Sequence, residues 1–132
     1  MQKTFKIPLH FSGRGLHSGE FINMTVRAAP ADHGIKFIRT DCPMSLAAID
    51  AKWNNVKTSP LCTKLVNSHG VSVKTIEHVL AALAGCGINN ALIEIDGPEP
   101  PILDGSARPF AIEFIRSGLV HSGEPIKVIK IL

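Results

Sequence analysis

The sequence has no tyrosine, one tryptophan and only 5% aromatic residues among its 132 positions. So few aromatic rings argue against a surface that stacks nucleic-acid bases or sugars. The three cysteines, Cys42, Cys62 and Cys86, lie far apart without a C-x-x-C pair, which excludes a disulfide scaffold and indicates reduced thiols. No apolar run approaches the roughly 20 residues that span a bilayer, and the N-terminus lacks the pattern of a secretory signal. We therefore expect no transmembrane segment and a cytoplasmic location.

The charged residues also form no cluster. Lys and Arg number 14 against 11 Asp and Glu, and the formal charge of +3 is spread along the chain. Without a basic patch, nucleic acid is not expected as a partner, whereas a mildly anionic ligand remains compatible with the charge. With 45% hydrophobic and 19% charged residues, a chain of this length can bury one core. We expect a single domain over residues 1–132.

Period-two alternation of apolar residues predicts that strands dominate the first part of the chain. The expected strands cover residues 3–11, 21–28, 34–40, 61–66 and 71–73. The turn sequence at 67–70 joins the last two into a hairpin. Because strands come early and helices late, the pattern predicts the class α+β, with a sheet packed on two helices.

Two helices are expected in the second half. Apolar residues at helical spacing predict a helix over 75–85, capped by Thr75. A second helix is predicted near 109–116, ended by Gly118. A buried strand is expected at 90–96 between them. A last strand is predicted over 126–132, where the apolar sequence ends as if it were cut or led into a missing segment.

The back of the first helix lacks the charged residues that an ordinary surface helix carries. The face of this helix that is predicted to pack on the sheet contains Ile76, Val79, Leu80 and Leu83, and this places His78 on the opposite side. Ala81, Ala82 and Gly85 accompany His78 there. Because small residues permit close approach, we expect a second domain, a subunit or a ligand to cover this face.

The adjacent pair Glu77 and His78 has a chemical interpretation. A first-turn position favours a carboxylate and a neutral imidazole, the form that binds metal. Glu77 could then act as general base beside a metal held by His78. An exposed Glu beside a hydrogen-bonded helix His stays open as the alternative, because Ala82 stands where H-E-x-x-H would place a second ligand. One His cannot hold a catalytic zinc, which usually takes three protein ligands.

Three other segments have structural interpretations. The glycine-rich loop at 12–20 matches no phosphate-binding motif, so it is predicted to be a tight hairpin connection that contains His17. Cys62 has no activating helix terminus or basic neighbour, which favours a buried strand thiol over a nucleophile. Asp104 is predicted to form a turn and to cap the second helix.

Several segments, taken together, carry a family resemblance. In chain order they are GRGLHSGE, HGIKFIRTD, TIEHVLAALAGCGINNALIEIDGPEPPILDGSARPF and the closing apolar segment. They cover most of the chain, and the TIEH helix followed by INNALIEID and PILDGS is the specific part. Together they resemble the N-terminal domain of the zinc-dependent UDP-3-O-acyl-N-acetylglucosamine deacetylases of lipid A biosynthesis.

The resemblance implies a fold of two similar domains, each a small mixed sheet packed with two helices, with the active site in the cleft between them. It implies that Glu77 is the general base for a zinc-bound water and that His78 is a zinc ligand. It also implies that Leu61 and Cys62 border the metal site and that His17 lies in a loop of the family, which assigns all three to substrate binding.

The same resemblance implies that part of the active site lies outside this sequence. The other zinc ligands, a Lys and the general-acid His belong to a second domain, which has no counterpart before Leu132. We therefore expect the N-terminal half of a zinc amidohydrolase acting on UDP-3-O-acyl-N-acetylglucosamine, with a C-terminal domain or an equivalent chain as its partner. The alternatives are a non-catalytic domain that pairs through Ala81, Ala82 and Gly85, and a small thiol-containing enzyme domain.

Overall fold

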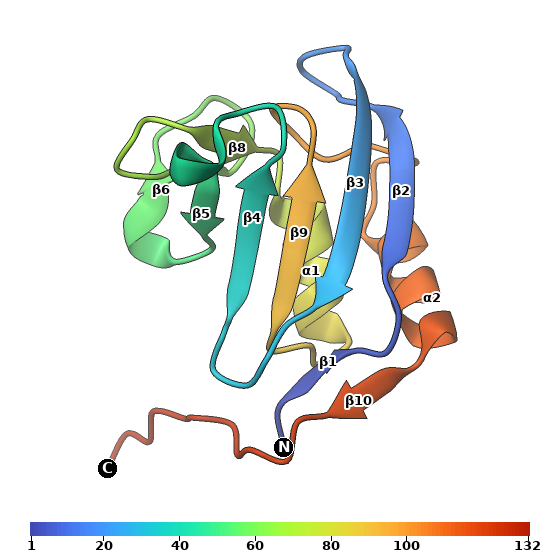
Figure 1. Cartoon of the computed structure of the whole chain (residues 1–132), viewed down its shortest axis with the longest axis vertical. Coiled ribbons are helices and arrows are strands. Elements are labelled where there is room, and N and C mark those ends of the chain that lie inside the picture. Colours follow the sequence, from blue (N-terminus) through green and yellow to red (C-terminus); the bar gives the residue numbers. More distant parts are fainter.

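A five-stranded mixed sheet with both helices on one face forms the body of the molecule in the computed structural model, which describes residues 1–132 (Figure 1). Its strands, in spatial order, are β2 (Leu9–Arg14), β3 (Phe21–Ala28), β9 (Ala91–Ile95), β4 (Ile35–Arg39) and β5 (Ala48–Asp50). β4 runs parallel to β9, and the other neighbours are antiparallel. The predicted class α+β is confirmed.

Two smaller sheets flank this body. At one end, β1 (Lys3–Phe5) pairs with β10 (Leu119–His121). At the other end, β6 (Val56–Lys57), β7 (Lys64–Val66) and β8 (Ser72–Lys74) form a three-stranded sheet. The antiparallel pairing of β7 with β8 confirms the predicted hairpin. Two 3-10 turns, Met44–Leu46 and Trp53–Asn55, connect the strands between β4 and β6.

The core lies between the main sheet and the helices α1 (Glu77–Gly85) and α2 (Arg108–Ser117). Alternation along β3 turns Ile22, Met24 and Val26 toward the helices, as the pattern predicts. Aromatic rings fill the side of the core under α2, where Phe114 packs edge-on against a second Phe ring with centroids 5.0 Å apart. Each such fully buried side chain stabilises the fold by roughly 1.5–3 kcal/mol.

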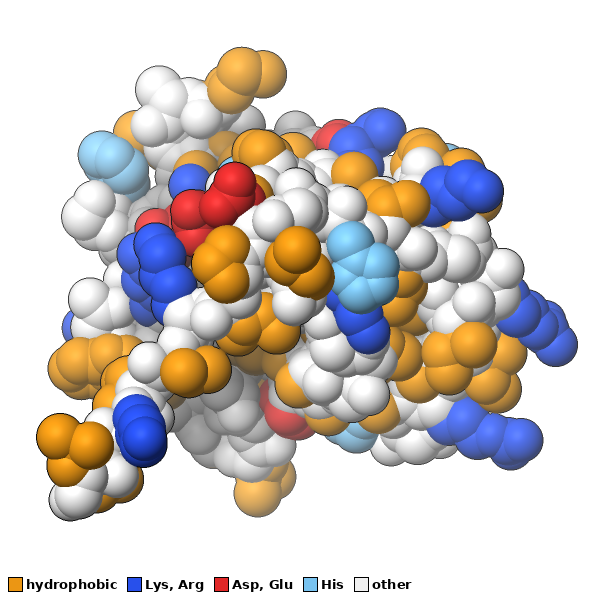
Figure 2. All heavy atoms as spheres, turned by 90° about the horizontal axis from the view of Figure 1, so that it is seen from below, with side chains coloured by type: hydrophobic (Ala, Val, Ile, Leu, Met, Phe, Trp, Pro, Cys, Tyr) orange, Lys and Arg blue, Asp and Glu red, His pale blue; other side chains and the backbone are white.

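Three strand predictions need correction. The segment 3–11 is two strands in different sheets, because a bend at 6–7 and Pro8, which has no backbone N–H, separate them. The segment 61–66 is a strand only from Lys64, since Leu61 has φ 59°, outside the extended region. The segment 126–132 forms no strand. It is an exposed tail that no strand pairs with, and Figure 2 shows its hydrophobic and lysine side chains projecting from the body.

The helix predictions are right in place and partly wrong in detail. α1 begins at Glu77 after Ile76, and Thr75 does not cap it, because Thr75 has φ 55° and its hydroxyl is bonded elsewhere. Ala82 is only 2% exposed, so it does not belong to the open face. It lies one turn before Cys86, whose Sγ is 4.0 Å from a carbonyl oxygen of α2, and therefore faces that helix.

The predicted C-terminal ends of both helices are confirmed, but the predicted cap at Asp104 is wrong. Gly118, at φ 80°, ends α2 as predicted, and α1 ends at Gly85. Asp104 forms a turn by accepting hydrogen bonds from Ser106, but it does not cap α2, which has no side-chain cap. Neither helix is long and apolar enough to cross a membrane.

Candidate functional site

Glu77 and His78 are the first two residues of α1, at the end of the molecule that carries β8 (Figure 1). Both side chains are half-buried. Oε2 of Glu77 accepts a hydrogen bond of 3.1 Å from the backbone N–H of Thr63. A carboxylate in the first helical turn is also favoured by the unpaired N–H groups of the helix. The structure therefore orients one carboxylate oxygen and places an imidazole next to it along the chain.

The segment around Leu61 and Cys62 lies beside this carboxylate, because Thr63 follows it directly. Leu61 is 94% exposed and has a positive φ, so the chain turns sharply there and presents an apolar side chain to solvent. Cys62 is half-buried, and its Sγ lies 3.3 Å from Oγ of Ser59. The prediction of a buried strand thiol is wrong, since the strand begins only at Lys64.

His17 lies in the connection between the antiparallel strands β2 and β3, which is the predicted hairpin connection but extends over residues 15–20 and is not a tight turn. Its side chain is exposed, and its backbone N–H donates to the carboxylate of Glu99 at 3.1 Å and 3.2 Å. The hydroxyl of Thr75 donates to the same carboxylate at 3.2 Å. The structure thus connects the His17 turn to the start of α1 through one intervening side chain.

Glu99 is the residue that the sequence interpretation missed. Its side chain is completely buried, at 0% exposure, and it accepts a further bond of 2.7 Å from the N–H of Ser18. Burial acts to raise the pKa of Glu99, but the hydrogen bonds from His17, Ser18 and Thr75 outweigh it, and the pKa is lowered. The signal in the sequence is a lone acid in GPEPPI, a segment with few charges and few backbone donors of its own.

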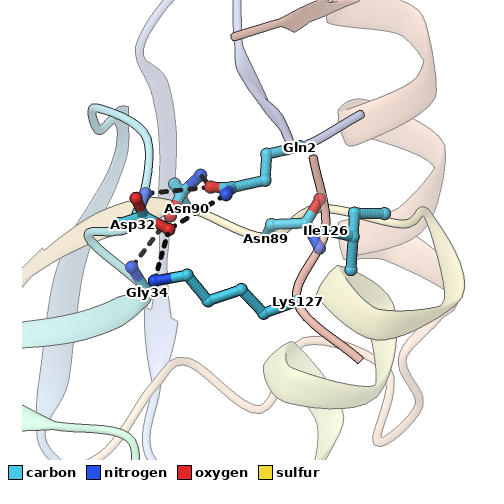
Figure 3. A pocket seen from close by; sticks show the side chains of 7 residues that line it. All are labelled: Gln2, Asp32, Gly34, Asn89, Asn90, Ile126 and Lys127. Carbon is cyan, nitrogen blue, oxygen red and sulfur yellow. Dashed lines mark hydrogen bonds and ion pairs between the residues drawn. The ribbon is translucent and has the colours of Figure 1, made fainter. Parts of the chain in front are cut away.

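None of the four hollows on the molecule is lined by Glu77. A polar pocket lies at the opposite end of the sheet and has a volume of about 240 Å³. There the side chain of Gln2 forms hydrogen bonds with Asp32 and with Asn90 (Figure 3). These bonds tie the N-terminal segment to the turn before β4, and Lys127 of the tail pairs with Asp32. An apolar hollow of about 440 Å³ lies on the outer face of β4 and β9. Neither contains a predicted site residue.

The chain has no group of three His, Cys, Asp or Glu residues that could hold a metal ion. His78 is therefore a single potential ligand beside Glu77. A zinc site built on it requires ligands that these residues do not supply.

The comparison with known proteins gives one family over almost the whole chain. The matching family model is described as LpxC, UDP-3-O-acyl N-acetylglycosamine deacetylase, and it covers residues 2–132. The chain belongs to this deacetylase family. The resemblance inferred from its motifs is thereby confirmed.

Curated relatives of this deacetylase-family chain agree. Proteins named UDP-3-O-acyl-N-acetylglucosamine deacetylase from Shewanella baltica and Shewanella oneidensis are each 44% identical to it over 130 residues, which is 98% of this chain. The match covers 42% of each relative, so the chain spans about two fifths of their length. The five predicted site residues lie within the matched range, residues 2–132.

Proposed function

We propose that residues 1–132 form the N-terminal domain of a deacetylase that hydrolyses the N-acetyl group of UDP-3-O-acyl-N-acetylglucosamine in lipid A (lipopolysaccharide) biosynthesis. The observation that carries the proposal is the Glu77–His78 pair in the first turn of α1, within a chain of the deacetylase family. We further expect a cytoplasmic location, where a UDP-linked substrate is available.

In this mechanism Glu77 is the proton acceptor. The N–H of Thr63 fixes Oε2, while no hydrogen bond within the chain reaches Oε1. Oε1 is thus the atom that can accept the proton of the attacking water. Anchoring one oxygen orients the other, which favours proton transfer along one direction.

His78 would be one ligand of a zinc ion, and the missing ligands and the general acid would come from a second domain. When bound, zinc supplies Lewis-acid polarisation of the amide carbonyl and a more acidic water. The half-buried imidazole of His78, next to Glu77, fits a ligand role at the edge of such a site. We assign Leu61, Cys62 and His17 to substrate binding around it. The segment of Leu61 and Cys62 is bonded to Glu77 through Thr63, and the His17 turn is joined through Glu99 to Thr75, just before α1.

A non-catalytic pairing domain remains the second candidate. The observation that favours it is the exposed face of α1, which consists of Ala81, Ala84 and Gly85. Ala82 is excluded from this face by its burial. A pairing domain predicts association with its partner but no effect of Glu77 or His78 on catalysis.

The test uses a two-domain protein in which this chain is joined to a matching second domain. Glu77→Gln keeps the side-chain shape and removes the proton acceptor, so zinc content should stay while turnover falls roughly 10²–10⁴-fold. His78→Ala removes a ligand, so zinc content and activity should fall together. His69→Ala, in an exposed turn, is the control. Full zinc content and a near-normal rate in His78→Ala would show that this imidazole is structural.

A further inference from the structure

The buried carboxylate of Glu99 has no cationic partner. None of the six ion pairs in the chain includes it. A buried charge is costly unless hydrogen bonds compensate it, and an apolar residue of similar size is often the more stable choice at such a place. What compensates Glu99 is a set of donors from two separate segments, the backbone at His17 and Ser18 and the hydroxyl of Thr75.

The first segment is the turn between β2 and β3, which closes directly over Glu99. A Cβ atom at Gly15 would lie 2.7 Å from Cγ of Glu99, so only glycine allows the backbone to approach this closely. Two consecutive N–H groups then point at the carboxylate. The orientation of the turn, and of His17 in it, depends on this contact.

The second segment leads into α1. Thr75 is β-branched and has φ 55°, a left-handed conformation that costs of order 1–3 kcal/mol and persists only where the surroundings impose it. Two contacts impose it here. The Thr75 hydroxyl donates to Glu99, and the N–H of Lys74 donates to the carbonyl of Pro98 at 2.9 Å. These two hydrogen bonds set the direction in which the chain enters α1, two residues before Glu77.

We propose that Glu99 is a positioning residue, which locks the His17 turn against the start of α1 and so fixes Glu77 relative to His17. The inference rests on the proposed function for its consequence in catalysis. Glu99 acts through Thr75 on one side, while the N–H of Thr63 holds Glu77 on the other. Removing its charge should loosen the first turn of α1 and leave the sheet intact.

The test compares Glu99→Gln with Glu94→Gln in the two-domain protein. Glu94 lies on the outer face of β9, where it pairs with Arg27, and it serves as the matched control. Since misplacement by about 1 Å can cost 10²-fold, we expect kcat to fall at least tenfold in Glu99→Gln at a temperature where circular dichroism shows it folded. The Glu94→Gln variant should stay within twofold of wild type.

A second pair of variants keeps the proposal testable if Glu99→Gln fails to fold. Thr75→Val removes the hydroxyl and should lower kcat. Thr75→Ser keeps the hydroxyl and should therefore retain most of the wild-type kcat. A general loss of packing would not give this rescue. A folded Glu99→Gln or Thr75→Val protein with wild-type kcat would overturn the proposal.

A measurement on the 132-residue chain separates this inference from the proposed function. In amide NMR spectra, Glu99→Gln should shift the signals of His17 and Ser18, and also that of Thr63, whose N–H is hydrogen-bonded to Glu77 and not to Glu99. An inactive wild-type two-domain protein would refute the proposed function. The Thr63 signal of the 132-residue chain would still show whether Glu99 affects the position of Glu77. An unmoved Thr63 signal would refute the positioning role even in an active enzyme.

Discussion

Replacing Gly15 by alanine should destabilise the chain by steric overlap alone. Gly15 does not have the positive φ that would itself disfavour alanine, but a Cβ there would lie 2.5 Å from Oγ of Ser18 and 2.7 Å from Cγ of Glu99. The Ser18 hydroxyl can rotate away if it gives up the hydrogen bond of 3.2 Å that it accepts from the N–H of Glu20. Glu99 cannot, because its carboxylate is held by donors from two segments. Overpacking of this kind costs about 1–3 kcal/mol.

For a domain of this size, that cost corresponds to a fall in Tm of roughly 3–15 °C. Urea unfolding followed by circular dichroism gives the free energy directly. Gly85→Ala is the control with the opposite sign, because no atom lies within 4 Å of its Cβ position, and alanine is favoured over glycine in a helix by up to about 1 kcal/mol. If Gly15→Ala and the wild type have the same midpoint of urea unfolding, the turn does not pack on Glu99 as described.

Two further predictions concern the pH dependence and the core. Because folding lowers the pKa of Glu99, the stability that its charge supplies should be present at pH 7 and be lost as the pH falls below the ordinary glutamate value of about 4.3. The difference in Tm between wild type and Glu99→Gln should therefore narrow at pH 3, and a constant difference would contradict this origin. Phe114→Ala should cost about 3–5 kcal/mol in urea unfolding, since the ring is fully buried against Phe5 and Phe11, and a cost below 1 kcal/mol would contradict the packing.

The parts of the fold that depend on local sequence pattern could be predicted. Alternation over 21–28 gives β3, helical spacing after Thr75 gives α1, and glycine at 118 ends α2. The family resemblance depends on the same local segments, including the Glu77–His78 pair. Each of these features is encoded by residues that are close together in the sequence, so the local pattern is enough to detect it.

The errors arise where a distant partner determines the local conformation. Thr75 has a good residue type for a helix cap, but its hydroxyl is bonded to Glu99, 24 residues later. The segment at 126–132 has the composition of a strand, yet strand formation requires a neighbour with which to pair. Glu99 itself was missed because nothing near it in the sequence shows that donors from residues 17, 18 and 75 converge on it.

The location of backbone strain supports a functional reason for this arrangement. Four non-glycine residues have positive φ, and two of them, Leu61 and Thr75, lie in the segments that hold Glu77. At about 1–3 kcal/mol each, they use a sizeable share of the roughly 5–15 kcal/mol by which a domain is stable. This cost has a reason if both segments must approach the first turn of α1 from fixed directions. Such fixed directions are needed to hold a carboxylate with one oxygen anchored and the other open.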